Sequence, residues 1–235
     1  MRCLHLTGPL RLLRRISTVM TQLILMRHGQ SVLNEQGKWG GWSSAELTPL
    51  GRVQAEAVAR RLAESGEAIA ALYSSPLRRA WDTAEIIGRA LNLRPIPHEG
   101  LREINFGQVD GLSLEEFRAA FPEHFARWLD RSDLSFVWPG GERRADFFRR
   151  VRRAAEEIVA RHPNETVVVV AHGGTIRGIL GHFLPAEFGD WWSYELGNCA
   201  LTRVEVDSSR ARLVVLNDTA HLDGGGTHGE ATDAG

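Results

Sequence analysis

Two histidines, His28 and His172, each closely follow a short apolar run, and each is followed by glycine. Such a run is typical of a buried strand, so both side chains are expected where a strand ends. Arg27 stands directly before His28. Arginine offers a planar fork of donors that suits phosphate, and histidine can act as a nucleophile or as an acid or base near neutral pH. The pair indicates phosphoryl chemistry, although three residues alone could equally form a surface pair.

Two further residues fit the same chemistry. Arg79 lies in the first turn of a helix expected after the second buried strand, and Glu103 stands in the irregular stretch 101–107. Two histidines, two arginines and one carboxylate suit phosphoryl transfer through a phosphohistidine. Burial near two arginines would lower the pKa of His28 and keep it neutral for attack. Because no cluster of carboxylates suits a metal ion, neither a metal nor another cofactor is expected.

Strands and helices alternate along the chain, which predicts a three-layer α/β/α sandwich with a mostly parallel central sheet. Since the carboxyl ends of parallel strands share one edge of a sheet, His28 and His172 are expected at the same edge. The apolar patterns place strands at 23–26, 68–73, 93–96 and 166–171, antiparallel or edge strands at 200–206 and 212–216, and helices at 49–64, 76–91, 122–129 and 142–161, with further helix starts at Ser113 and Thr175.

One domain is expected over residues 20–222, with a helical lid at about 103–141, where the strand–helix rhythm is interrupted. Residues 1–19 are rich in arginine and contain no acidic residue. They could form a transit-peptide-like segment, or Met20 could open the real protein, which is the interpretation favoured here; either way they stand outside the fold. The tail 223–235 is expected to be disordered.

Composition excludes several classes of function. The 28 basic and 29 acidic residues nearly cancel, which does not suggest a nucleic-acid binder. Cys3 and Cys199 give neither a metal site nor a disulfide framework, so a reducing, cytoplasmic setting is expected. No apolar run has the length of a membrane helix, and no membrane partner is expected. A homodimer is possible, but nothing in the sequence requires one.

In this order, the motifs resemble the histidine phosphatase superfamily, also called phosphoglycerate mutase-like. The resemblance spans about 22–222 and is carried by the stretches 25–31 with Asn34, 47–48 with Gly51, 74–80 with 83–84, 101–103 with 106–107 and Gly111, 139–142, and 171–174.

The resemblance implies a role for each matching residue. His28 is the nucleophile and Glu103 the general acid that protonates the leaving oxygen. The phosphoryl group is held by Arg27, Asn34, Arg79 and His172, of which His172 also counts as catalytic. Candidate substrate-binding residues in or beside the same motifs are Ser31, Gly40, Gly41 and Gly173.

The same site supports a phosphatase or a mutase, and the lid favours the phosphatase branch. Ile104 and Phe106 stand where mutases of the family carry a basic residue and a tyrosine, and Leu114 stands where they carry a lysine. An apolar lid would hold a triply charged phosphoglycerate poorly. The expectation is therefore a metal-independent phosphomonoesterase for a small phosphorylated metabolite. The alternatives are a 2,3-bisphosphoglycerate-dependent phosphoglycerate mutase and a non-catalytic module that binds a phosphorylated ligand.

Two other groups of residues have a functional and a structural interpretation. Trp138, Trp191 and Trp192 could line a pocket for an aromatic leaving group, but packing is favoured. The arginines of the helix at 142–161 could attract anions, but a solvated face is favoured; they are Arg143, Arg144, Arg149, Arg150, Arg152 and Arg153. The leaving group itself is not determined, and candidates include phosphosugars, phosphoglycerates, phosphoamino acids and nucleotides.

Overall fold

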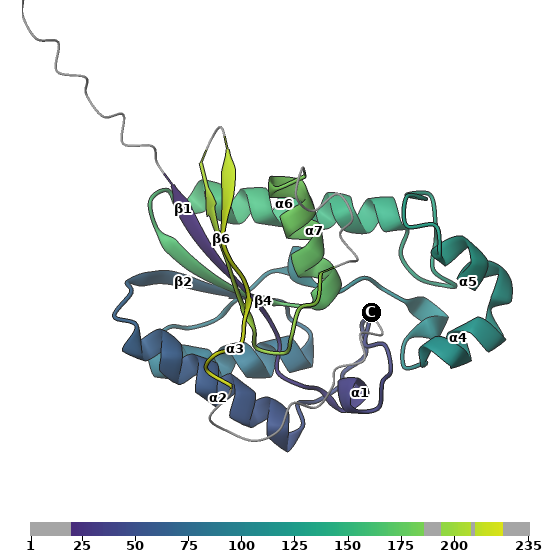
Figure 1. Ribbon diagram of the computed structural model, residues 1–235, viewed down its shortest axis with the longest axis horizontal. Coiled ribbons are helices and arrows are strands. Elements are labelled where there is room, and N and C mark those ends of the chain that lie inside the picture. Colours follow the sequence, from purple (N-terminus) through teal and green to yellow (C-terminus); the bar gives the residue numbers. More distant parts are fainter. Residues whose placement is uncertain (1–19, 186–193, 208–209, 223–235) are drawn as a thin grey trace, which may run out of the picture.

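The computed structural model describes residues 20–185, 194–207 and 210–222. The expectations for 1–19, for Trp191 and Trp192, and for the tail 223–235 lie outside these residues. A six-stranded sheet in the order β3-β2-β4-β1-β5-β6 forms the centre (Figure 1). Its strands are β1 (Thr21–Arg27), β2 (Ile69–Ser74), β3 (Ile96–Pro97), β4 (Thr166–Ala171), β5 (Leu201–Val206) and β6 (Ala211–Asp218).

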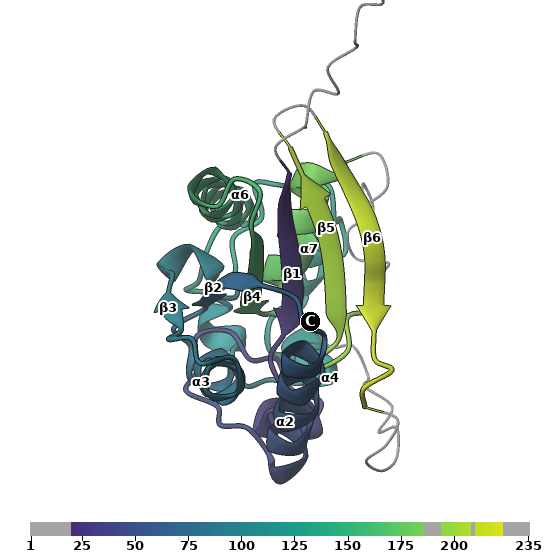
Figure 2. The same cartoon turned by 90° about the vertical axis from the view of Figure 1, so that its left-hand side faces the viewer.

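The pairing of the strands brings the two histidines together. β1, β2, β3 and β4 pair in parallel, whereas β5 runs antiparallel to β1 and to β6 at one edge (Figure 2). Arg27 at the end of β1 is paired with Ala171 at the end of β4. The next residues are His28 and His172, and the His28 amide donates to the Ala171 carbonyl at 3.0 Å. Neighbouring parallel strands therefore deliver both imidazoles to one edge, as predicted.

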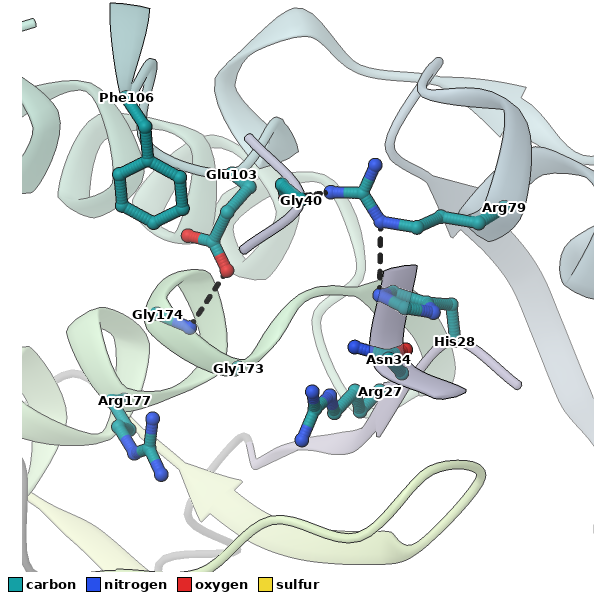
Figure 3. A pocket seen from close by; sticks show the side chains of 10 residues that line it. All are labelled: Arg27, His28, Asn34, Gly40, Arg79, Glu103, Phe106, Gly173, Gly174 and Arg177. Atoms are coloured by element: carbon teal, nitrogen blue, oxygen red, sulfur yellow. Dashed lines mark hydrogen bonds between the residues drawn. The ribbon is translucent and has the colours of Figure 1, made fainter. Parts of the chain in front are cut away.

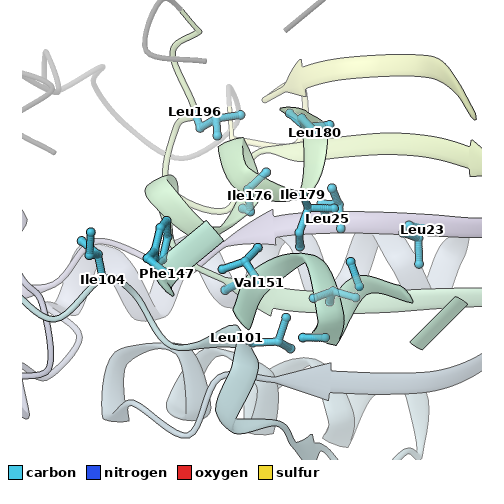
Figure 4. Close-up of a cluster of buried hydrophobic side chains, with 14 of the residues drawn as sticks. Leu23, Leu25, Leu101, Ile104, Phe147, Val151, Ile176, Ile179, Leu180 and Leu196 are labelled. Carbon is cyan, nitrogen blue, oxygen red and sulfur yellow. The ribbon is translucent and has the colours of Figure 1, made fainter. Parts of the chain in front are cut away.

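Helices cover both faces of the sheet, which confirms the three-layer sandwich. α2 (Pro49–Glu64) and α3 (Arg78–Leu91) pack on one face, and α6 (Arg144–Arg161) and α7 (Gly173–Phe183) on the other (Figure 1). Alternate residues of β1 point to opposite faces: Leu23 and Leu25 contact the cluster with α6 and α7 (Figure 4), and Ile24 and Met26 the cluster with α2 and α3. A strand buried on both sides must be apolar throughout, which is why its sequence predicted it.

Several helix ends follow from capping residues. Thr48 caps α2 by accepting a hydrogen bond from the Gly51 amide, with Pro49 at the first helical position, as predicted. Ser113 opens α4 (Leu114–Ala120) with the expected capping box. The sequence did not predict α1 (Val32–Glu35), a single turn whose capping box joins Ser31 and Asn34.

The predicted cap of α7 was wrong. His172, not Thr175, is the N-cap: its backbone is extended and its carbonyl accepts the first helical bond, from Ile176 at 2.9 Å. Thr175 lies inside the first turn, where its hydroxyl donates to the Arg102 carbonyl at 3.0 Å. α3 also begins later than expected, at Arg78, and β3 is shorter, with two residues.

The segment 103–141 contains the short helices η2 (Gly107–Val109), α4 and α5 (Pro122–Trp128), and it lies beyond one end of the sheet (Figure 1). It packs around Trp39, whose ring centroid lies 5.2–5.3 Å from those of Phe106, Phe117, Trp128 and Trp138. Trp138 is buried in this aromatic cluster. It therefore has the packing position that the sequence favoured. One more short helix, η1 (Glu99–Leu101), precedes this segment.

The predicted solvated face of α6 was wrong for two of its arginines. Arg144 is 1% exposed and donates to the carbonyls of Asp130 and Asp133. Arg150 is partly buried against the stretch that carries Glu103. Both arginines contact backbone carbonyls outside their own helix, and a local pattern of charges cannot predict such contacts. The other four arginines, Arg143, Arg149, Arg152 and Arg153, are exposed as predicted.

Candidate active site

A pocket opens at the sheet edge where β1 and β4 end (Figure 3). It contains about 390 Å³ of space free of protein atoms, counting the part open to solvent. The lining residues are Arg27, His28, Asn34, Gly40, Arg79, Glu103, Phe106, Gly173, Gly174 and Arg177.

His28 is held in one neutral form by its two ring contacts. Nδ1 lies 2.8 Å from the Gly29 carbonyl, and Nε2 accepts a hydrogen bond of 3.0 Å from Arg79 Nε. Because a carbonyl only accepts and a guanidinium only donates, the ring carries its proton on Nδ1 and a lone pair on Nε2. Burial, and then the charges of Arg79 and Arg27, hold the pKa of His28 well below its usual value. The imidazole is therefore neutral at physiological pH, as a nucleophile must be.

Arg79 comes from the first turn of α3 and is 1% exposed. Its guanidinium donates to the carbonyls of Gly40, Gly41 and Ser43 as well as to His28. Burial lowers the pKa of Arg79 to about 10, so the side chain remains charged at neutral pH. This one cation thus fixes both the loop at one side of the pocket and the imidazole at its base.

Glu103 lies opposite, with its carboxylate held by two backbone amides; Figure 3 shows the bond from Gly174. Oε2 accepts from the Gly174 amide at 2.9 Å, and Oε1 from the Ile104 amide at 2.9 Å. The side chain is 7% exposed and lines the pocket. A carboxyl so placed can exchange a proton with a group bound between it and His28.

His172 is buried, with its ring centroid 5.1 Å from that of His28. Its Nε2 lies 2.8 Å from the Ser75 hydroxyl. Its Nδ1 is buried and has no hydrogen-bond partner among the described residues. Burial, and then the charge of Arg79, hold the pKa of His172 well below its usual value. A neutral ring whose Nε2 accepts from Ser75 would offer an unused N–H donor at Nδ1.

The family model of the histidine phosphatase superfamily (branch 1) matches residues 23–219. The chain belongs to the histidine phosphatase superfamily. It is 34% identical over 203 residues to phosphoserine phosphatase 1 of Hydrogenobacter thermophilus, covering 86% of this chain and 95% of that protein. It is 32% identical over 218 residues to glucosyl-3-phosphoglycerate phosphatase of Mycobacterium tuberculosis, covering 86% and 96%.

Solved structures support the assignment of this chain to the histidine phosphatase superfamily. A phosphoserine phosphatase mutant from Entamoeba histolytica, in complex with phosphoserine, has a TM-score of 0.75 at 30% identity over 86% of this chain and 99% of that one. The mycobacterial glucosyl-3-phosphoglycerate phosphatase has a TM-score of 0.74 at 33% identity, over 85% and 100%. This histidine phosphatase is a phosphoric monoester hydrolase, and the mutase and the non-catalytic module are not favoured.

Seven of the residues predicted from the sequence line the pocket of this histidine phosphatase, and three do not. The seven are Arg27, His28, Asn34, Gly40, Arg79, Glu103 and Gly173. Of the others, His172 contacts the ring of His28, and Gly41 presents its carbonyl to Arg79. Ser31 is the buried N-cap of α1, where its hydroxyl fixes Asn34.

Gly174, Arg177 and Asn198 belong to the site but were not among the residues predicted. Gly174 donates to Glu103, and Arg177 lines the pocket and donates to the Tyr194 carbonyl at 2.8 Å. Arg177 follows Gly173 by four residues, so helical spacing could have placed it on the same face. Asn198 donates to the His28 carbonyl at 2.8 Å, a contact over 170 positions that has no local signal.

The described residues hold no group of three or more histidine, cysteine, aspartate or glutamate side chains that could bind a metal ion. Over the same residues, no helix is long and apolar enough to cross a membrane.

Proposed function

We propose that this histidine phosphatase hydrolyses a small phosphomonoester through a phosphohistidine on Nε2 of His28. The observation that carries the proposal is the neutral ring, with Nδ1 donating to the Gly29 carbonyl and the Nε2 lone pair directed into the site. Nε2 attacks phosphorus, and the bond from phosphorus to the ester oxygen breaks. A metal ion takes no part in the proposed steps.

Four groups would hold the phosphoryl oxygens. Arg27 and Asn34 line the pocket beside His28, and Arg79 would exchange its bond to Nε2 for one to a phosphoryl oxygen. The buried Nδ1 of His172 would donate to another oxygen. Donors fixed before the reaction stabilise the charge on the equatorial oxygens in the transition state, and they need little rearrangement.

Glu103 would act first as an acid and then as a base. In the first step it gives its proton to the departing ester oxygen, which leaves as an alcohol. In the second step it takes a proton from water, whose oxygen attacks phosphorus and breaks the phosphorus–nitrogen bond. Inorganic phosphate and neutral His28 are then restored, and Glu103 is protonated again for the next cycle.

The substrate class we propose is a phosphorylated alcohol of a small metabolite, of which O-phosphoserine is one candidate. The names of the relatives support it, since two are phosphoserine phosphatases. We also propose that the segment 103–141 acts as the lid, because Phe106 from that segment lines the pocket. Cytoplasmic location and a homodimer remain predictions, to be checked by fractionation of cells and by sedimentation.

The test is phosphate release from a panel of phosphomonoesters in EDTA, with conversion of 3-phosphoglycerate followed with and without 2,3-bisphosphoglycerate. We expect release without added metal, its loss in His28→Ala, and an acid-labile phosphoprotein after rapid quenching of the wild type. Release that survives in His28→Ala, or release that EDTA abolishes, would overturn the proposal. Isomerisation of phosphoglycerate without net release would point to a mutase.

A further inference from the structure

The side chain of Arg150, on α6, holds the backbone on which Glu103 stands. Its guanidinium donates to three carbonyls of this stretch, those of Gly100 at 3.1 Å, Arg102 at 2.8 Å and Glu103 at 3.2 Å. Hydrogen bonds from a charged donor are stronger than those between neutral groups. The backbone at Glu103 therefore cannot shift without breaking several of them together.

Glu142 completes the contact from the other side of Glu103. It pairs with Arg150 in bidentate geometry, Nε to Oε1 at 3.0 Å and NH2 to Oε2 at 2.8 Å. The Asn105 amide donates to Glu142 Oε2 at 3.3 Å, and the Glu142 amide donates to the Asn105 carbonyl at 2.8 Å. Arg150 thus holds the backbone of residues 100–103, and Glu142 holds that of residue 105. Together they fix the chain on both sides of the Glu103 side chain.

This ion pair differs from the others on α6. The Arg150 and Glu142 side chains are 22% and 16% exposed, whereas those of Arg153 and Glu157 are 81% and 36% exposed. Exposed pairs of this kind contribute little to stability, and Arg153 donates to Glu157 at 2.9 Å on the same helix. Phosphate binding does not explain the Gly140–Glu142 motif either, because Glu142 does not line the pocket.

The carboxylate of Glu103 is positioned by a second element, the start of α7. The Gly174 amide donates to Oε2. A Cβ placed on Gly174 would lie 2.5 Å from Oε1 of Glu103, closer than real contacts allow. Since the atom it would meet is the end of a flexible side chain, alanine at this position would displace the carboxylate rather than the backbone.

We propose that Arg150, Glu142 and Gly174 are positioning residues that set the carboxyl of Glu103 for proton transfer to the leaving oxygen. The inference rests on the proposed role of Glu103 as the general acid. It assigns to the motif at 140–142 a function in catalysis that acts through Glu103, without contact with substrate.

The test compares two kinds of leaving group in steady-state kinetics. p-Nitrophenol departs readily as an anion and needs no proton, whereas an alkyl alcohol needs one from the acid. We would measure kcat/KM for p-nitrophenyl phosphate and for the alkyl phosphomonoester that the wild type hydrolyses best, because kcat/KM reports only the steps up to departure of the leaving group. The variants are Arg150→Gln, Arg150→Lys, Glu142→Gln and Gly174→Ala, with Glu103→Gln as the reference for loss of the acid.

A displaced acid should lower kcat/KM for the alkyl ester by about tenfold to a hundredfold, and it should leave kcat/KM for p-nitrophenyl phosphate near wild type. The ratio of the two kcat/KM values would then move towards that of Glu103→Gln. Arg153→Gln, on the same helix, is the matched control and should keep the wild-type ratio. Gly174→Ala keeps the ion pair intact and suits a helix better than glycine, so it tests the proposal without threatening the fold.

Three outcomes distinguish the positioning role from the role of Glu103 itself. If Arg150→Lys, Glu142→Gln and Gly174→Ala lower kcat/KM equally for both substrates, or for neither, the positioning role is overturned. If Glu103→Gln itself shows no preference for the better leaving group, Glu103 is not the acid, and the proposed function and this inference both fail. If Glu103→Gln shows the preference and the other variants follow it, the inference stands.

Discussion

Arg79 Nε donates a hydrogen bond of 3.0 Å to Nε2 of His28, the nitrogen opposite the one that donates to Gly29. The arginine therefore faces the lone pair that would attack phosphorus. The same guanidinium is tied to the Gly40 and Gly41 carbonyls. The Arg79 side chain thus selects the reactive tautomer of His28 and also holds the loop that contains Gly40 and Gly41.

Replacing Arg79 with lysine should impair catalysis, although the charge is kept. An ammonium cannot reproduce the planar fork that reaches His28 and the loop carbonyls at once. We expect kcat/KM to fall by about a hundredfold to a thousandfold, measured as phosphate release. Arg78→Lys is the control, since Arg78 is half exposed and pairs with Glu46 on the surface. Near-normal activity in Arg79→Lys would show that charge alone suffices.

The lowered pKa of His28 predicts how the enzyme responds to acid. Because the neutral form is the reactive one and its pKa lies well below the usual 6.5, His28 should stay neutral as the pH falls through 6.5. We expect its ring signals in a proton NMR titration to remain those of neutral imidazole at that pH. Arg27→Gln should move the transition to higher pH, but not to the usual value, since burial is the largest cause. A midpoint near 6.5 in the wild type would contradict this.

The same shifts predict that stability falls in acid. Below pH 6.5 the unfolded chain protonates His28 and His172, whereas the folded chain does not until their lowered pKa values are reached. In that window the free energy of unfolding should decrease as pH decreases, by about 1.4 kcal/mol per pH unit for each histidine. Urea unfolding of the wild type and of His172→Asn would measure it. An equal pH slope in the two proteins would exclude His172 as a source.

Arg144 should be more important for stability than its neighbour Arg143. Arg144 is 1% exposed and satisfies the carbonyls of Asp130 and Asp133. Arg144→Met would remove the donor from these partly buried hydrogen bonds, which should cost about 1–3 kcal/mol. The Arg143 side chain is 56% exposed, so Arg143→Met should change the free energy of unfolding by less than about 0.5 kcal/mol. Equal urea midpoints for the two variants would refute the difference.

Gly29 should not tolerate a side chain. A Cβ there would lie 2.3 Å from the Gly51 carbonyl oxygen, which is backbone at the start of α2 and cannot move easily. Gly29→Ala should therefore lower the free energy of unfolding by about 1–3 kcal/mol and also disturb His28. Gly197→Ala is the comparison, because its Cβ would meet atoms no closer than 3.6 Å. Urea unfolding with a parallel activity assay separates the two effects.

Some of these features were predictable because they are local. Thr48 with Pro49, and Ser113 with Glu116, marked helix starts through hydrogen bonds made within one turn. Arg144 is instructive because it lies in helical phase with the buried residues Phe147, Val151 and Ala154. The spacing of Arg144 thus indicated a buried position, although its charge favoured an exposed one.

The sequence by itself determined the layers of the fold and the placement of His28 and His172 at one edge of the sheet. Strands buried on both faces must be apolar throughout, and the ends of parallel strands share an edge, so local pattern and topology together were enough. Only the tertiary structure decided that Arg150 holds Glu103 and that Asn198 holds His28. Those bonds join backbone and side chains 47 and 170 positions apart. A carbonyl accepts a hydrogen bond in the same way whatever side chain its residue carries, so nothing in the sequence marks it as the acceptor.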